Sequence, residues 1–474
     1  MPSSCPKLRG LGLIWLLVAA VAAAPGEAAP QLEAEREGRL AAAVGARVEE
    51  RWGELLATLG LADVPAPHAA LASPVELGAV LRRNRLYFSS CEAARRVSEQ
   101  ELVTPAGCAA AAALGERALA AYAIGEYRIA ISTSFERQAA QLLRLYPSDL
   151  LPSDPAAVEA LLDVLLWHEL AHALQDRAHD LVRLGSAARG FESRAALSAV
   201  IEGHAQQCAK RLARSPRHRS AFGVLARSHD EAPAQVDAAS PRAIAACEAG
   251  FAYRAGLRFC EALEQQPSGS ELLSRAFHAP PTTLWHVEHP SAWIAGEADP
   301  GARFEEPLRA FAGASFERER WASALENATR ESLRRALSAL EPARADRLVG
   351  AVRGSRVLHL RERAGEERLL FAVLDLGTPE LAEQFVAAEE EASRRFDAQL
   401  QEEPALALRA SYARLGRDGA LWILKQSRDA AGAVERSGLL LARTGSLVLE
   451  LNVLGATSEE RARALALALA ARLR

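Results

Sequence analysis

The chain has 474 residues, of which 50% are hydrophobic, and its formal net charge is -4 at pH 7. A chain of this length can bury a sizeable core and is expected to form two or more domains. The charge is ordinary, and no basic block alternates with aromatic residues, so we expect no nucleic-acid partner.

The first 24 residues have the pattern of a secretory signal peptide. Lys7 and Arg9 precede an apolar stretch over residues 11–24, and Pro25 follows it. That stretch is too short to span a bilayer, and a basic start followed by a short apolar run is typical of an export signal. We therefore expect residues 1–24 to be removed and the mature protein to be secreted or periplasmic. No later stretch has the length and apolar character of a membrane span.

Five cysteines follow the predicted signal peptide: Cys91, Cys108, Cys208, Cys247 and Cys260. Export permits disulfides, and an odd count leaves at least one thiol unpaired or bonded to another molecule. If residues 243–263 form one helix, its two cysteines lie about 20 Å apart and cannot pair with each other. We expect Cys91 to pair with Cys108, and Cys208 with one of the two helical cysteines. The alternative is that all five are small buried side chains.

The segment before the central motif contains one predicted helix and two predicted strands. Residues Gln31–Gly60 have a helical pattern. Leu86–Phe88 and Tyr127–Ile131 have the character of strands. In the second, apolar and other side chains alternate, and the segment is bounded by Gly125 and by Ser132–Ser134. Three prolines between residues 147 and 155 mark the loop that leads into the next helix.

That next helix carries His168-Glu169-x-x-His172 inside an apolar pattern. Two histidines four positions apart lie on one face of a helix, where they can hold one metal ion, and Glu169 flanks the open side of that ion. Between residues 164 and 174, Glu169 is the one ionisable residue besides the two histidines. Imidazoles in an apolar stripe are costly unless something binds them, so the pattern predicts a metal site. The alternative is a pair of hydrogen-bonded core histidines beside an ordinary glutamate.

Two histidines leave a metal site incomplete, and two downstream glutamates compete to be the third ligand. His179 is one residue too late for the spacing that supplies a third histidine. Glu192 starts the next helix, where the helix dipole favours a solvated acid. Glu202 is the one acid in residues 195–205, and no lysine or arginine lies three or four positions away. A carboxylate in that run needs a buried cation, so Glu202 is the first candidate, with Glu192 and His204 as alternatives; the fourth position is left for water.

Two further roles follow from the position of the motif. A strand placed before the motif helix often lies along the cleft of zinc peptidases, so by analogy Tyr127–Ser132 is expected to be an edge strand that pairs with an extended substrate. Asp176 lies one turn beyond His172 and is a candidate to orient that imidazole through its second nitrogen. The alternative for Asp176 is a solvated acid at the helix end.

Four short motifs, in this order along residues 120–295, resemble a family of bacterial exported HExxH proteins of gluzincin type. They are His168–Asp176, Ala199–Gly203, a helix with Tyr253, Gly256 and Phe259, and His289–Pro290. The resemblance implies a mainly helical zincin-like domain with a small sheet. It also implies His168, His172 and Glu202 as Zn²⁺ ligands and Glu169 as the catalytic carboxylate. The chain departs from the family at Arg177, where a glutamine is usual, and at His204, where an acidic residue is usual.

The sequence therefore predicts a secreted zinc metallopeptidase that hydrolyses peptide bonds with metal-activated water and Glu169 as general base. The resemblance draws attention to Tyr253 and His289 as donors to the developing oxyanion. A core tyrosine and a structural loop histidine are the respective alternatives. The alternative function is a non-catalytic zinc-binding protein that recognises a partner; an intact Glu169 favours the enzyme.

The last part of the chain predicts a second, smaller domain. Arg318–Leu340 has the pattern of a charged helix that stops before Pro342. Beyond residue 348, six strand-like segments and two helical segments follow. We expect an α+β fold with a metallopeptidase domain over residues 25–345 and a C-terminal α+β domain over residues 346–474. The second domain has one histidine and no cysteine, so we expect it to bind a protein partner, to position or inhibit the first, or to be purely structural.

Overall fold

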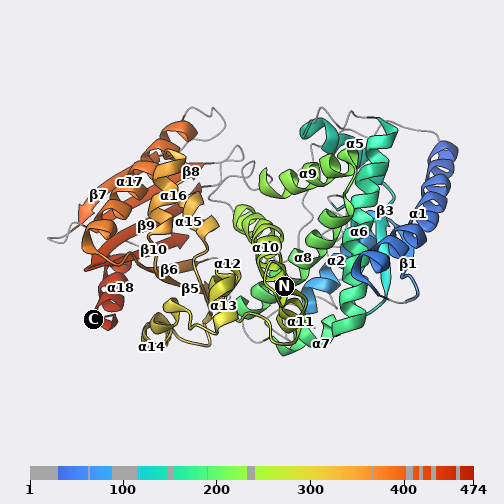
Figure 1. Ribbon diagram of the computed structural model, residues 1–474. Helices are drawn as coiled ribbons and strands as arrows, with labels where there is room; N and C mark the ends of the chain where they lie inside the picture. Colours follow the sequence, from blue (N-terminus) through green and yellow to red (C-terminus); the bar gives the residue numbers. More distant parts are fainter. Residues whose placement is uncertain are drawn as a thin grey trace.

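The computed structural model describes residues 30–61, 64–87, 116, 118–147, 154–188, 191–231, 241–363, 367–401, 409–415, 420–428, 434–454 and 459–473. They form two parts that lie side by side in Figure 1. One part is mainly helical with a three-stranded sheet, and the other is built on a seven-stranded antiparallel sheet, so the predicted α+β class is confirmed. The predicted signal peptide lies outside the described residues, as do Cys91 and Cys108. Within the described ranges, no helix has the length and apolar character needed to cross a membrane.

The helical part is assembled around α6 (Pro155–His179). Its start is set by Asp154, whose side chain accepts a hydrogen bond from the amide of Ala157 at 2.7 Å, and by the proline in its first turn. Most of its residues are buried by α1 (Pro30–Leu59), α5 (Phe135–Leu145), α7 (Leu181–Ala187), α8 (Phe191–Leu212) and α9 (Pro216–Glu231). The polar motif therefore sits inside the core rather than on its surface.

The small sheet has the order β1-β3-β2, with β1 (His68–Ala72) parallel and β2 (Ala120–Ala123) antiparallel to β3 (Arg128–Ser132). The predicted strand at Tyr127–Ser132 is thus present, but the prediction that it lies at an edge is wrong. It is the central strand, because β1, whose pattern did not stand out in the sequence, pairs with its other side. The edge beside the motif helix belongs to β2. The predicted strand at Leu86–Phe88 is also wrong for its first two residues, which lie in α2 (Pro74–Tyr87).

Helix α10 (Pro241–Glu264) crosses α8 at the closest helix contact of this part. A Cβ atom added to Gly203 would lie 2.0 Å from the carbonyl carbon of Gly256, and one added to Gly256 would lie 2.0 Å from the carbonyl oxygen of Ala199. Only residues without a side chain allow this approach. Beyond α10 follow α11 (Gly269–His278), α12 (Leu284–Glu288), α13 (Pro290–Ala295), η1 (Pro300–Phe304) and α14 (Glu305–Ser315).

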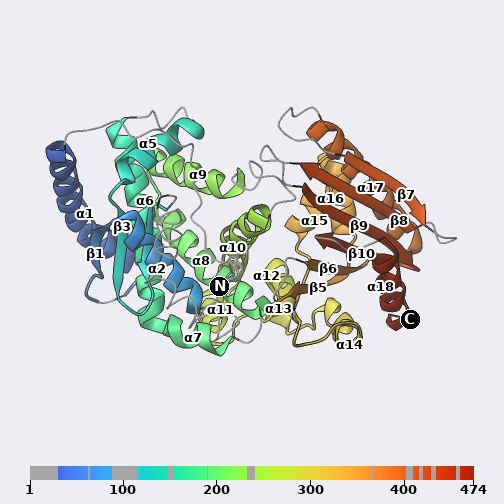
Figure 2. The ribbon, with the colours of Figure 1, turned by 180° about the vertical axis from the view of Figure 1, so that it is seen from behind.

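The second part is a seven-stranded sheet of order β4-β5-β6-β10-β9-β8-β7 in which every neighbouring pair is antiparallel. The strands are β4 (Trp321–Glu326), β5 (Gly354–Glu362), β6 (Arg368–Asp375), β7 (Arg409–Leu415), β8 (Ala420–Arg428), β9 (Val434–Thr444) and β10 (Leu447–Leu454). Helices α15 (Arg330–Ala336), α16 (Pro342–Gly350) and α17 (Pro379–Gln401) share one buried cluster with it. Helices α14 and α18 (Glu459–Arg472) share the other, and Figure 2 shows them on the opposite side.

All six strands predicted beyond residue 348 are found, but the predicted helix at Arg318–Leu340 is wrong. That segment is strand β4 followed by the short helix α15, because β4 completes the sheet against β5 and buries Trp321 beside Phe316. Pairing with a partner strand overrides the local preference of a charged segment. The seven-stranded sheet therefore begins before residue 346. The predicted domain boundary between residues 345 and 346 stays a prediction.

Candidate metal centre

Helix α6 presents His168 and His172 on one face, as their spacing predicts. Both side chains are buried, the two Nε2 atoms lie 3.0 Å apart, and the ring planes are perpendicular. Two nitrogens that face each other in this way can share one proton or bind one metal ion, so the groups beside them decide between the two. A third group able to act as a ligand would favour the metal ion.

Glu202 of α8 is that third group. Its Oε2 atom lies 3.2 Å from Nε2 of His168 and 3.4 Å from Nε2 of His172. Ligand atoms of the three residues all lie within 4.8 Å of one another, and all three side chains are buried. The prediction that these three residues form a group able to hold a metal ion is confirmed.

The electrostatics of the group are those of a site that needs a cation. Burial alone would raise the pKa of the Glu202 carboxyl, but the two imidazoles hold that pKa well below its usual range. Burial would lower the pKa of His172, yet the Glu202 carboxylate raises it to about 9. Despite the short distances, Oε2 of Glu202 and Nδ1 of His168 have no hydrogen-bond partner of acceptable geometry among the described residues. Buried polar atoms are rarely left so, and a bound metal ion would satisfy the carboxylate oxygen.

Gln175 supports His172 from behind, a role the sequence did not reveal. Its Oε1 lies 2.9 Å from Nδ1 of His172, and its Nε2 donates to the carbonyl of Ile201 at 2.9 Å and lies 3.0 Å from Nδ1 of His204. An amide oxygen only accepts, so the Nδ1 atom of His172 carries a proton, and the neutral ring would offer Nε2 to a metal ion. His204, an alternative third ligand from the sequence, is instead a neutral partner of Gln175, because burial lowers its pKa to about 4.

Asp176 does not orient His172 and is not a solvated acid. Its carboxylate accepts hydrogen bonds from the Tyr122 hydroxyl at 2.9 Å, the Gly125 amide at 2.8 Å and the Leu181 amide at 3.1 Å. The first two donors belong to the hairpin of β2 and β3. Asp176 therefore fixes the small sheet against the motif helix.

Glu169 lies between the metal group and β2. It is buried, and its Oε2 accepts a hydrogen bond from the backbone amide of Tyr122 at 2.6 Å. Burial raises the pKa of this carboxyl above its ordinary value, against the opposing effect of the two imidazoles. A carboxylate with a raised pKa beside a metal group has the chemistry of a proton acceptor.

Tyr253 of α10 reaches the same group from the opposite helix. Its ring centroid lies 5.8 Å from that of His168, and its hydroxyl is near the Glu202 carboxylate. Burial and the two nearby carboxylates raise the pKa of Tyr253, so the hydroxyl keeps its proton and acts as a donor. The close contact of Gly203 with Gly256 is what brings α10 near enough for this.

His289, the other predicted donor, lies elsewhere. Its Nδ1 bonds the carbonyl of Trp285 at 2.8 Å, its Nε2 lies 3.2 Å from the guanidinium of Arg330, and its ring stacks on the indole of Trp285. It does not line the cavity beside the metal group. In the described arrangement His289 is a structural residue between the two parts of the molecule.

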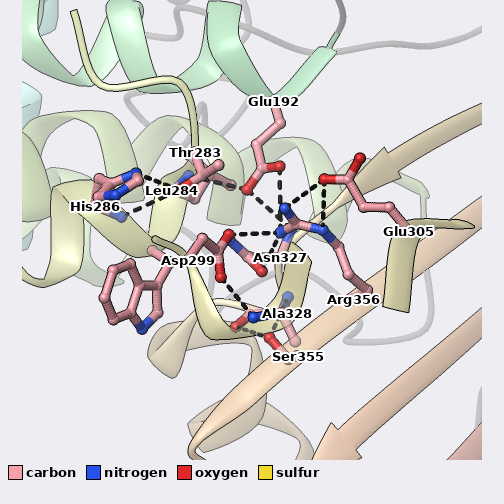
Figure 3. A network of polar contacts seen from close by, with 12 residues as sticks. Glu192, Thr283, Leu284, His286, Asp299, Glu305, Asn327, Ala328, Ser355 and Arg356 are labelled. Carbon is pink, nitrogen blue, oxygen red and sulfur yellow. Dashed lines mark hydrogen bonds and ion pairs between the residues drawn. The ribbon is translucent and has the colours of Figure 1, made fainter. Parts of the chain in front are cut away.

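Glu192, the alternative carboxylate ligand, is also explained by the junction between the two parts (Figure 3). Its Oε1 accepts from the amides of Leu284 at 3.0 Å and Asn327 at 3.2 Å, and its Oε2 lies 3.5 Å from the guanidinium of Arg356. Arg356, 1% exposed, also pairs with Asp299 at 2.9 Å. Glu192 is therefore not solvated at its helix start, and it faces a guanidinium rather than the two histidines.

The metal group borders a small cavity of about 30 Å³. Its walls include Glu169, Tyr253 and Ser198, the last with a buried hydroxyl that has no partner among the described residues. Leu81 and Asn84 of α2 close another side. A volume of this size holds roughly two water molecules, which is far too little for a peptide.

A second group of polar side chains forms a Ser-His-Asp chain of contacts like that of a serine hydrolase, but its role is structural. Ser215 Oγ lies 3.0 Å from Nδ1 of His218, whose Nε2 lies 3.1 Å from Asp163. The same oxygen also accepts from the backbone amide of His218 at 3.1 Å, as a helix cap does. Thr283 and His286 repeat the arrangement at the start of α12. We therefore assign the serine to helix capping.

The cysteines do not form the predicted pair involving Cys208. Cys208 and Cys260 are both buried free thiols, and burial raises the pKa of Cys208 to about 12. The side chain of Cys247 lies outside the described residues. Both free thiols pack as small apolar side chains, which agrees with the alternative stated above for these two cysteines.

Comparisons with family models, with curated proteins and with solved structures find no match to this chain. Any statement about its activity therefore depends on the geometry of the group formed by His168, His172 and Glu202 and of its neighbours.

Proposed function

We propose that this protein is an exported zinc metallopeptidase of gluzincin type. The observation that supports it is the buried group of His168, His172 and Glu202, with Glu169 held beside it. A tetrahedral zinc ion with bonds of about 2.0–2.1 Å places its ligand atoms about 3.3–3.4 Å apart. The three separations of 3.0, 3.2 and 3.4 Å are close to that spacing, and the three residues border the cavity.

Zinc held there would lower the pKa of a bound water and polarise a peptide carbonyl. Glu169 would serve as the proton acceptor there, because its carboxylate is next to the group and is held through Oε2 by the Tyr122 amide. The same carboxyl would then donate that proton to the leaving amine. Gln175 keeps His172 in the tautomer whose Nε2 faces the group.

Tyr253 supports the proposal as the donor to the developing oxyanion, in preference to His289. Tyr253 lines the cavity beside the metal group, whereas His289 bonds Trp285 and Arg330 and does not line that cavity. Tyr253→Phe is expected to lower kcat by about 10²-fold at unchanged zinc content. His289→Ala should leave kcat near the wild-type value in the same peptide assay. A larger loss from His289→Ala than from Tyr253→Phe would reverse this assignment.

A non-catalytic zinc-binding protein is the second candidate, and the small volume of the cavity is the observation that favours it. A site that holds about two waters cannot accept a peptide without movement. The two candidate functions differ in one respect: a peptidase needs the Glu169 carboxylate as a general base, and a non-catalytic zinc-binding protein does not. Metal content and peptide-library cleavage should be measured on one purified sample, for wild type and Glu169→Gln. The peptidase predicts stoichiometric zinc in both and cleavage in wild type alone; zinc-loaded wild type that cleaves nothing supports the second candidate.

A further inference from the structure

The outer edge of β2 lies beside the metal group. In the ladder with β3, Ser132 donates to the carbonyl of Leu119, so alternate residues of β2 point their backbone groups away from β3. Tyr122 is one of these, and the amide of Ile124 continues the same row. The Tyr122 amide donates to Glu169, so this edge runs directly beside the metal group.

Asn84 of α2 occupies the next two backbone groups of that edge. Its side-chain amide donates to the carbonyl of Tyr122 at 2.6 Å, and its side-chain oxygen accepts from the amide of Ile124 at 3.2 Å. One residue of a neighbouring parallel strand bonds a carbonyl and the amide two residues later in this way. The carboxamide of Asn84 thus takes the place of a peptide backbone, and its side chain is buried.

The helix that carries Asn84 packs on the small sheet through a cluster of its own. Leu77, Val80 and Leu81 form a small buried cluster with alanines of the sheet and its approaches, separate from the main core of the helical part. Arg83 pairs with Glu126 in the turn between β2 and β3. Because this cluster is separate, movement of α2 would expose Leu77, Val80 and Leu81 but would leave the main core closed.

We propose that α2 is an internal plug of the metal site, and that Asn84 mimics the backbone of the peptide that the site binds. An extended peptide would take over the bonds of Asn84 to Tyr122 and Ile124 and would require α2 to move away from β2. Leu81, which lines the cavity with Asn84, would leave with it and open space beside Glu169. The identity of the ligand rests on the proposed peptidase function; the contacts of α2 do not.

The test compares binding of one probe, a dialanine hydroxamate, to zinc-loaded full-length variants. Asn84→Ala removes both mimicking bonds, and Leu81→Ala loosens the helix without touching them. Each is expected to bind the probe at least tenfold more tightly than wild type. Val75→Ala is the matched control, because Val75 lies on the same helix but is 43% exposed and outside the cluster. Circular dichroism and zinc content verify that every variant is folded and loaded.

Hydrogen exchange of wild type with saturating probe gives the second readout. Ligands usually protect what they touch, whereas a displaced plug predicts faster exchange in residues 74–87 and slower exchange in β2. Equal affinity of all variants, or unchanged or slower exchange in α2, would refute the plug. If Asn84→Ala binds the probe tightly and still cleaves no peptide, the plug stands and the peptidase proposal fails. If wild type and Asn84→Ala cleave equally fast, the peptidase stands and the plug fails.

Discussion

At the residue scale, the metal group depends on one neutral amide that joins both ligand helices. Gln175 of α6 accepts from His172 and donates to the carbonyl of Ile201, the residue before Glu202. A donor and an acceptor on one planar group fix the relative position of the two helices and the tautomer of the histidine. Partners of this kind typically contribute 10–100-fold to metal affinity.

Replacing Gln175 by methionine, which has a similar shape and no amide, is therefore expected to weaken zinc binding by about 10–100-fold. Gln207→Met is the matched control. Gln207, which lies on α8, is buried like Gln175, but its side-chain amide donates to Glu264 at 2.6 Å, away from the metal group. Zinc affinity is measured by competition with a chelator of known affinity. Equal losses in the two variants would mean that packing, and not the bond to His172, is responsible.

The two candidate carboxylates should separate cleanly in the same titration. Glu202→Ala removes a ligand atom and should abolish tight zinc binding, because two imidazoles alone leave the site incomplete. Glu192→Ala should keep the wild-type zinc affinity. It should instead lower the free energy of unfolding by roughly 1–3 kcal/mol, since two backbone amides and Arg356 lose their acceptor. Loss of zinc from the Glu192 variant would contradict the assignment.

Much of the site could be predicted from the sequence, for a physical reason. His168, Glu169 and His172 are neighbours on one helix, so their spacing alone places them together. Glu202 could be found because an acid without a nearby base in an apolar run needs a partner elsewhere. Gln175 and Asn84 carry no such signal, since a neutral amide is tolerated on any helix and its partners lie on other elements. The position of His289 could not be predicted either, because its sequence context does not reveal its contact with Arg330; its role as a donor stays a prediction.

At the element scale, the crossing of α8 and α10 positions two functional side chains at once. Gly203 follows Glu202, and Gly256 lies one turn from Tyr253, so the closest backbone contact is adjacent to both. Gly203→Ala puts a Cβ against the backbone of Gly256, which no rotamer change can relieve. We expect a loss of roughly 1–3 kcal/mol in unfolding free energy or more, and weaker zinc binding, because Glu202 is displaced.

Gly223→Ala is the control for that substitution. Gly223 lies within α9, and a Cβ there would meet nothing within 4 Å. Alanine is favoured over glycine in a helix by about 1 kcal/mol, so this variant should be slightly more stable than wild type. Both values come from urea unfolding at equal zinc loading. A Gly203→Ala protein as stable as wild type would show that the helices can separate without cost.

Helices and strands could be predicted where their hydrophobic pattern is strong and local. They could not be predicted where pairing with another strand determines the structure. The six later strands alternate over several residues, and α17 and α18 have long helical periods, so the sequence reveals them. Strand β4 is short, contains no β-branched residue and exists because β5 offers an edge. The central place of β3 depends in the same way on β1, which is rich in alanine and carries a weak strand signal.

At the scale of the whole molecule, Arg356 links the two parts. It comes from β5, and its buried guanidinium meets Glu192 of the ligand helix, Asp299 and Glu305, as Figure 3 shows. Removing one partner from a buried ionic cluster leaves the others uncompensated, which typically costs about 3–5 kcal/mol. Arg356→Met should lower the free energy of unfolding by that amount.

Arg320→Met makes the same chemical change on the surface of the same sheet. Its ion pair with Glu362 is exposed, so the unfolding midpoint should hardly move. Calorimetry of both variants measures the difference. If the buried and exposed substitutions cost the same, the cluster does not hold the ligand helix to the sheet.

The contact between Gly203 and Gly256 should be conserved among related proteins. A lineage can replace loops, surface charges and much of the sheet without disturbing the metal group, but it cannot add a methyl group at either glycine without moving α8 and α10 apart. Homologues that retain the two histidines and the glutamate should therefore retain both glycines, or change the two positions in concert. A search for HExxH, a later Glu-Gly pair and a third glycine one turn after a tyrosine would find such homologues after overall similarity has faded.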